Sequence, residues 1–478
     1  MKAWKKFGGS LVCLMALCLW VKPLLARQEE GEKPKPAGRQ YPPAIDPTGD
    51  QQNPDQGPQA LQPDNQALSS IQVPTLGTPE IRHSYWVPGL TYSNVVLSNA
   101  LNGEANTGWN STSFVSGDVS VLEAWSHSTL STNYSGGGFF STDPIQGNGQ
   151  YHQLAMAYEI DEKRWQLLFV DQFSYLPQTA FGFGGPTGLA LPGVTGTLAV
   201  PLPGLETTYL PSQTIFTTTG PRYSNASAAQ LTYAVSPRGS ITIAGVYGAL
   251  RFINPGNVDS DSVIVDAGYD YALTRRDSVG LAYRFGAYHF PGSPQAVGDH
   301  LAEVIYGRKI TGRLALKLAG GPEIINFRIP IGVSTQKITG SADAALTYGF
   351  ARGDVALGYT HDVSGGSGVF TGSTIDQANA AWNRKLTLAW SGSLSFGYAK
   401  NQPILSPSGI TPPVYGAWLA GAGLKRPLGR TANLSLAYQA QIQRANIAIC
   451  NNPTCGTSRT LNQVFLTFQW TTRPLVLR

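Results

Sequence analysis

The stretch VIVDAGYDYALTRRDSVGLAYRFG, residues 263–286, decides the fold class. Apolar residues occupy every second position on both sides of a polar break at residues 275–277. The positions between them hold mostly small or polar residues, such as Gly268 and Arg284. Because successive side chains of a strand point to opposite faces, the stretch predicts a β-hairpin with one apolar and one wetter face.

The same hairpin recurs along the chain, with tight turns at residues 351–354, 390–393 and 427–430. Counting such strands predicts about sixteen, the first centred near residue 125 and followed by a longer loop over 135–149. Short and long connections alternate along the chain. The pattern therefore predicts an antiparallel up-and-down meander with both chain ends on the side of the short turns.

The composition favours a membrane barrel over a soluble β protein. With 54 Gly and 33 Pro the chain does not suit a helical bundle, and its charged fraction of 13% is about half that of a soluble domain. Many strands reach the roughly nine to eleven residues that a tilted membrane strand needs. Tyr and Trp recur near strand ends, as at Tyr271, Tyr348, Trp390, Tyr398 and Tyr438. A soluble solenoid or propeller is the alternative, but in hydrocarbon a closed barrel pairs every backbone group of its sheet, whereas an open sheet does not.

The first 116 residues divide into three predicted parts. Residues 1–26 read as a signal peptide, with an apolar run too short to span a bilayer. Residues 27–83 are rich in Pro and Gln and predict a disordered linker. Residues 84–116 are left open between a periplasmic segment, a plug and an extra strand, and the barrel is expected over 117–470.

The repeated apolar-x-apolar-x-Tyr strand with its tight turn resembles a bacterial outer-membrane β-barrel of the porin-like type. The last strand ends at Phe468 and Trp470, similar to the aromatic ending that the barrel-assembly machinery recognises. Unlike such proteins, this chain continues through a tail at 471–478. The resemblance implies an all-β transmembrane barrel in the outer membrane, with lipid and the assembly machinery as partners.

Cys450 and Cys455 are the two cysteines that remain after signal removal, with four residues between them that include a proline. That spacing in an oxidising compartment predicts a small disulfide loop. Free thiols and a metal site are the weaker alternatives, and no metal or cofactor is expected.

If the apolar face of each strand contacts lipid, the charged residues on the opposite face should point into the lumen. Their signs are mixed, with acids in excess, and the alternative is that they are solvated residues without a filter role. They are Glu159, Asp266, Asp270, Arg284, Lys317, Asp343, Asp354, Asp362 and Lys385.

The leading functional hypothesis is a porin-like channel for passive diffusion of small hydrophilic solutes. The alternatives are a plugged barrel with a structural or surface-interaction role and a transporter for a hydrophobic or saccharide ligand. The long apolar loop 176–222 is expected to narrow the pore, cover its mouth or contact a neighbouring subunit, since homo-oligomerisation is left open.

The remaining functional classes are less well supported. Catalysis is not expected, because His361 and Asp362 are adjacent on a strand and should point to opposite faces. The net charge of +5 comes from scattered residues and gives no case for nucleic acid. The N-terminal tail would lie in the periplasm, as a spacer or a contact to a periplasmic partner.

Overall fold

The computed structural model describes residues 84–98, 109–142, 147–176, 215, 221–253, 256–328, 334–405, 414–446 and 459–476. The predicted signal peptide and linker, both mature-chain cysteines and most of the loop 176–222 lie outside these residues. Within them, no helix is long and apolar enough to cross a membrane.

The described residues form antiparallel strands joined in chain order. The strands are β1 (Tyr85–Ser98), β2 (Trp109–Ala124), β3 (Ser128–Ser141), β4 (Gly149–Asp161), β5 (Trp165–Leu176), β6 (Arg222–Ser236), β7 (Gly239–Phe252), β8 (Ser260–Ala272), β9 (Asp277–His289), β10 (Ala296–Lys309), β11 (Leu314–Arg328), β12 (Ser334–Phe350), β13 (Gly353–Ser364), β14 (Ser373–Lys385), β15 (Ser391–Pro403), β16 (Tyr415–Pro427), β17 (Ala432–Ala445), β18 (Arg459–Thr471) and the short β19 (Leu475–Val476).

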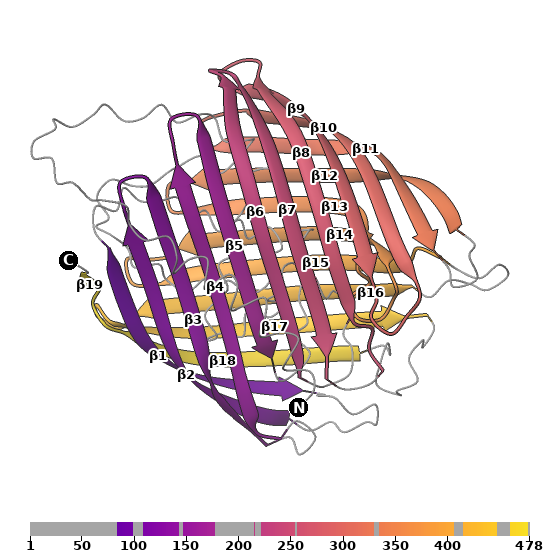
Figure 1. The fold of residues 1–478 in the computed structure, drawn as a ribbon. Coiled ribbons are helices and arrows are strands. Elements are labelled where there is room, and N and C mark those ends of the chain that lie inside the picture. The colour runs from indigo at the N-terminus through magenta and orange to yellow at the C-terminus, as the bar shows by residue number, and fades with distance from the viewer. Residues whose placement is uncertain are drawn as a thin grey trace, which may run out of the picture. The chain divides into compact units, whose positions relative to one another are not determined.

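The sheet closes on itself. Each of the strands β1 to β18 pairs with its neighbour in sequence, and β18 pairs with β1 from Gly89↔Thr471 to Ser98↔Asn462. Figure 1 shows the long, tilted strands of this sheet running side by side. The antiparallel barrel predicted from the sequence is thus confirmed, with eighteen barrel strands in the described residues instead of about sixteen.

The two additional strands come from the beginning of the barrel. β1 lies in the segment left open by the sequence, so the described barrel begins at Tyr85 and not near residue 117. The predicted strand centre at residue 125 is wrong, because residues 125–127 form the tight turn between β2 and β3, closed by Trp125 N–H donating to Ser128 O over 2.8 Å. The predicted loop 135–149 is mostly strand as well.

The residues after β18 do not form a free tail, because two of them pair with β1. Leu475 and Val476 form β19, which pairs with Trp86 and Tyr85 at the start of β1. Phe468 and Trp470 lie on the outer face of β18, 42% and 40% exposed. The two ends of the described barrel are therefore joined by the same antiparallel ladder.

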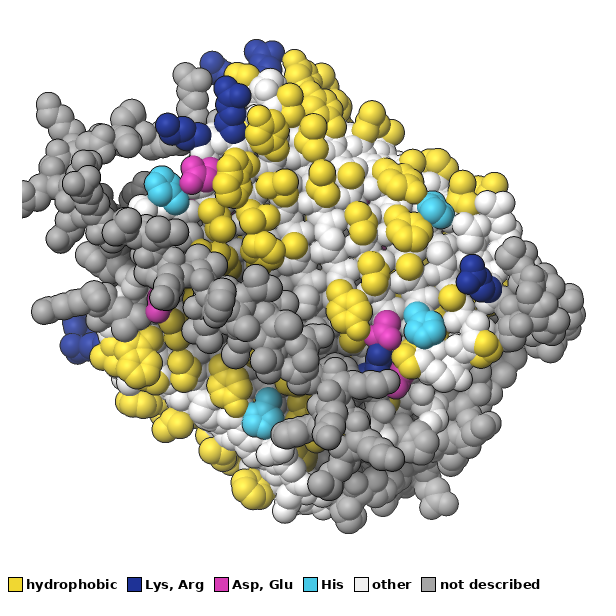
Figure 2. Space-filling view, in the orientation of Figure 1, with side chains coloured by type: hydrophobic (Ala, Val, Ile, Leu, Met, Phe, Trp, Pro, Cys, Tyr) yellow, Lys and Arg dark blue, Asp and Glu magenta, His cyan; other side chains and the backbone are white. Residues whose placement is uncertain are grey.

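The outer face is apolar along its strands. On β9 and β10, Leu281 and Val304 are 63% and 59% exposed, while the alternate residues Arg284 and Leu301 are buried. Figure 2 shows hydrophobic side chains spread over this face, with Lys and Arg gathered at its upper edge. A closed sheet with all neighbours paired and an apolar exterior has the construction of a transmembrane barrel.

Outward tyrosines in the middle of β3, β9 and β17 carry polar partners on the next strand. Tyr134 and Tyr283 contact the Nδ1 atoms of His152 and His300 over 2.9 and 2.8 Å. Tyr438 donates to Asn462 Oδ1 over 2.8 Å. Such amphipathic rings suit the boundary between hydrocarbon and headgroups, where one end is apolar and the other wet.

Candidate functional site: a brace across the barrel interior

The barrel wall opens between β12 and β13 near the longer loops. The pairing of β13 with β12 stops at Ala342↔His361, although β13 continues to pair with β14 as far as Ser364↔Ser373. Residues 362–364 and 373–375 are buried at every position and do not alternate. We call residues 362–375 the inward hairpin, because its tip leaves the wall and enters the barrel interior.

The tip of the inward hairpin reaches strands on the other side of the interior. Val258 N–H, in the β7–β8 loop, donates to Gly368 O over 2.8 Å. Tyr288 of β9 donates its hydroxyl to Val363 O over 3.4 Å, and Thr371 donates to Gln295. In a sheet ordered β8-β9-β10-β11-β12-β13, these contacts require the segment to cross the interior.

Glycines allow the tight turn at this tip. Gly366 and Gly368 have φ of 85° and 77°, and Ser367 between them has φ of 53°. A side chain at residue 368 would overlap the ring of Phe252. Both the backbone conformation and the close approach to β7 therefore require glycine here.

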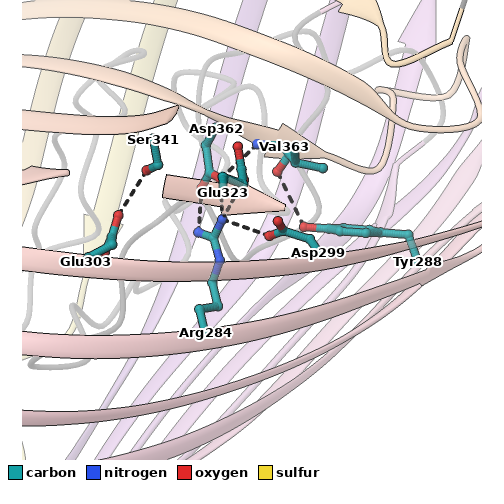
Figure 3. A network of polar contacts seen from close by, with 8 residues as sticks. All are labelled: Arg284, Tyr288, Asp299, Glu303, Glu323, Ser341, Asp362 and Val363. Carbon is teal, nitrogen blue, oxygen red and sulfur yellow. Dashed lines mark hydrogen bonds and ion pairs between the residues drawn. The ribbon is translucent and has the colours of Figure 1, made fainter. Parts of the chain in front are cut away.

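Four charged side chains form what we call the cross-barrel brace: Arg284 of β9, Asp299 of β10, Glu323 of β11 and Asp362 of β13. The guanidinium of Arg284 donates from Nη1 to Asp362 Oδ2 over 2.6 Å and from Nη2 to Asp362 Oδ1. The same Nη2 lies 3.0 Å from Asp299 Oδ2 and 3.3 Å from Glu323 Oε1. Figure 3 shows the three carboxylates converging on the guanidinium. The brace ties the inward hairpin to three strands of the wall.

The carboxylate of Asp362 is further fixed by its own backbone. Val363 N–H donates to Asp362 Oδ1 over 2.7 Å. All four side chains of the brace are at most 4% exposed. Because buried charges are tolerated only when paired and hydrogen-bonded, this geometry constrains where the hairpin can lie.

An apolar cluster packs beside the brace. Its members come from strands on both sides of the interior, including Ile264 of β8, Val297 of β10, Phe327 of β11 and Val363 of the inward hairpin. A second cluster joins Val369 and Phe370 of the hairpin to Tyr415 and to Ile215, the one described residue of 177–220. The side chains of these two clusters therefore occupy part of the barrel interior at this level and narrow it.

The nine predicted lumen residues lie on the rows opposite the exposed aliphatic rows. The structure brings Arg284 and Asp362 together and places Asp266 directly opposite Arg284 on β8. Lys317 and Asp343 form a separate ion pair of 3.4 Å. The other four do not join the brace, and two of them contact polar neighbours: Glu159 accepts from Gln166, and Asp354 accepts from Asn383 over 3.2 Å.

Comparison with solved structures gives likenesses of the fold only. Pseudomonas aeruginosa OccK2 (OpdF) is similar over 81% of this chain and 98% of its own, at 11% identity and a TM-score of 0.44. Pseudomonas aeruginosa OpdQ, at 11% identity, covers 83% of this chain and 100% of its own with a TM-score of 0.42. Acinetobacter baumannii OccAB3, at 10% identity, covers 81% and 99% with a TM-score of 0.41. Neither a known protein family nor a curated protein matches the sequence.

His361 and Asp362 are separated as their adjacency predicts. His361 lies on the outer face, where its Nδ1 is 2.6 Å from Asp376 Oδ1. Asp362 points the other way, to Arg284. The histidine and the aspartate therefore do not form one catalytic pair.

Sequence reasoning missed Asp299 and Glu323, the other two carboxylates of the brace. Both occupy alternate positions among apolar residues of their strands, with Leu301 and Ile325 as inward neighbours. The period of two could have placed them inward in the same way as Arg284. To predict that these two carboxylates lie close to Arg284, the register between the strands must be known. The sequence pattern does not determine that register.

Proposed function

We propose that this chain is a porin-like outer-membrane channel that lets small hydrophilic solutes diffuse passively through the barrel. The observation that carries the proposal is the closed antiparallel barrel with polar inward rows and an apolar exterior. Barrels of sixteen to eighteen strands are too wide for wall side chains to fill and ordinarily hold an aqueous channel. The inward hairpin and the brace would form its narrowest level.

The experiment is reconstitution of the purified full chain in a planar lipid bilayer. We expect discrete conductance steps whose size rises with salt concentration. A correctly folded barrel, judged by its faster gel mobility before heating, that gives no steps would contradict the channel proposal.

The inward charges favour cations over anions. Acids such as Asp266, Asp270 and Glu303 outnumber bases on the described inward rows, where Lys317 and Arg284 are already paired with acids. Charged rings along a pore bias ion flow by electrostatics. In a potassium chloride gradient the reversal potential should shift towards the equilibrium potential of potassium. A shift towards the equilibrium potential of chloride would contradict the preference for cations.

A plugged barrel with a structural or surface-interaction role is the second candidate. It is favoured by the buried packing of Val369 and Phe370 against Ile215 and Tyr415 inside the barrel. On this alternative, conductance steps would be absent from the natural chain and would emerge only when the inward hairpin is shortened. The bilayer recording on both chains separates the two functions.

A further inference from the structure

The cross-barrel brace holds more negative charge than its guanidinium offsets. Among the described residues, Arg284 is the base in contact with the carboxylates of Asp299, Glu323 and Asp362. When all four groups are ionised the brace carries a net charge of −2. The side chains of Asp299 and Glu323 are 0% exposed, so solvent does not screen this excess. A buried charge of this size requires a compensating partner.

Two carboxylate oxygens of the brace have no hydrogen-bond donor as long as Asp299 and Glu323 are both ionised. Asp299 Oδ1 and Glu323 Oε2 are buried and have no donor among the described residues. The other oxygen of each group already contacts Arg284. Buried oxygens without donors are rare in folded proteins and point to a ligand or a proton that completes the cluster.

We propose that Asp299, Glu323 and Asp362 bind one divalent cation, and that the ion is Ca²⁺. One oxygen from each of the three groups lies within 4.8 Å of the others. Oxygens bonded to one Ca²⁺ at 2.3–2.6 Å lie at most about 5 Å apart, whereas oxygens around Mg²⁺ lie at most about 4.2 Å apart. Oxygens within 4.8 Å of one another fit around one Ca²⁺, which also accepts irregular geometry and water as a further ligand.

The ion would hold the inward hairpin to the wall. Asp299 and Glu323 are on the adjacent strands β10 and β11, whereas Asp362 comes from the hairpin that has left β12. A cation bound between them would neutralise the negative charge that Arg284 leaves uncompensated. It would also link the same three segments. The narrow level of the barrel would then be more rigid with calcium than without it. This inference does not depend on solute passage, because an ion can be bound in an open or a plugged barrel.

The test measures calcium binding directly. The full chain is refolded into detergent free of lipopolysaccharide, treated with EGTA, and equilibrated with ⁴⁵Ca²⁺ alone. We expect one ion per barrel in the natural chain and loss of that ion in Asp299→Asn and Glu323→Gln. Asp118→Asn is the matched control, since Asp118 is also buried and inward but accepts hydrogen bonds from Thr91, Ser116 and Ser135. It should keep the ion.

A second measurement on the natural chain removes any dependence on how well the variants fold. Calcium should raise the temperature at which the folded gel band is lost, and EGTA should reverse the rise. A natural chain that binds no calcium at millimolar concentration overturns the proposal and assigns the compensation to a proton shared by Asp299 and Glu323. Equal binding by the natural chain and a folded Glu323→Gln variant overturns it as well.

Discussion

Arg284 of β9 and Asp362 of β13 meet across the barrel interior through two hydrogen bonds, from Nη1 and Nη2 of the guanidinium to both carboxylate oxygens. Four strand-to-strand steps around the wall separate them. The contact is available because β13 leaves β12 after His361. A fork-shaped guanidinium that contacts both oxygens fixes orientation as well as distance. The pair therefore determines how far the inward hairpin reaches into the barrel.

Replacing Arg284 by Met should destabilise the barrel and enlarge its pore. The change leaves three buried carboxylates without their cation, and breaking a buried ion pair costs about 3–5 kcal/mol. We expect a lower melting temperature of the folded gel band and larger or noisier conductance steps. Arg308→Met is the control, because Arg308 is 56% exposed and lies 3.6 Å from Asp277, where such pairs contribute about 1 kcal/mol or less. Equal effects of the two changes would refute a special role for Arg284.

Shortening the inward hairpin should widen the channel. Ser364 and Ser373 are paired in register, so residues 365–372 can be replaced by an Asn-Gly turn that joins the two strands directly. The replacement removes Val369 and Phe370 from the interior while leaving the wall strands in place. Conductance steps should increase in size. The same replacement in the β3–β4 loop, residues 142–148, should leave the step size unchanged, and an unchanged step in the first variant would exclude the hairpin as the constriction.

The sequence predicted the fold well wherever strands alternate between large apolar and small residues. β8, β9 and the strands from β13 onwards have such rows, with Leu281 and Tyr283 as examples. It failed at β3, where Gly136, Gly137 and Gly138 replace the large residues. Without bulky side chains there is no contrast between the faces, so the period of two disappears although the backbone pairs normally.

The candidate site was predictable only in part. Alternation placed Arg284 and Asp362 on the same side of the sheet, but the sequence gives no distance between residues four strands apart. The departure of β13 from β12 depends on the end of one ladder after Ala342, a tertiary feature without a local signal. The Gly and Ser residues of 364–368 indicate a turn, yet not its direction.

Gly137→Ala should impair the pairing of β3 with β2. A Cβ at residue 137 would overlap Val115 O on the paired strand β2, which the rigid ladder cannot relieve by moving a side chain. We expect a loss of about 1–3 kcal/mol in stability and a lower yield of folded barrel. Gly117→Ala is the matched control, since a Cβ there meets nothing within 4 Å. A folded yield equal to that of the control would show that the ladder at Val115 adapts.

Asp259→Asn should stabilise the barrel in a manner that depends on pH. Asp259 lies in the β7–β8 loop, where its Oδ1 accepts the Phe252 N–H over 2.9 Å, and burial raises the pKa of its carboxyl above the ordinary 3.8. The folded state therefore disfavours the ionised form, and this cost appears as the pH rises through the raised pKa.

Asparagine keeps the acceptor oxygen for Phe252 N–H but carries no charge. The variant should therefore melt at a higher temperature than the natural chain at pH 7. This gain should be absent at pH 3, where the Asp259 carboxyl of the natural chain is protonated in both the folded and the unfolded state. Asp259→Ala, which also loses the hydrogen bond to Phe252, should gain less than asparagine at pH 7 and should be the less stable chain at pH 3. Melting curves of the three chains at the two pH values check the sign, and a gain of equal size at pH 3 and pH 7 would show that it does not come from ionisation of Asp259.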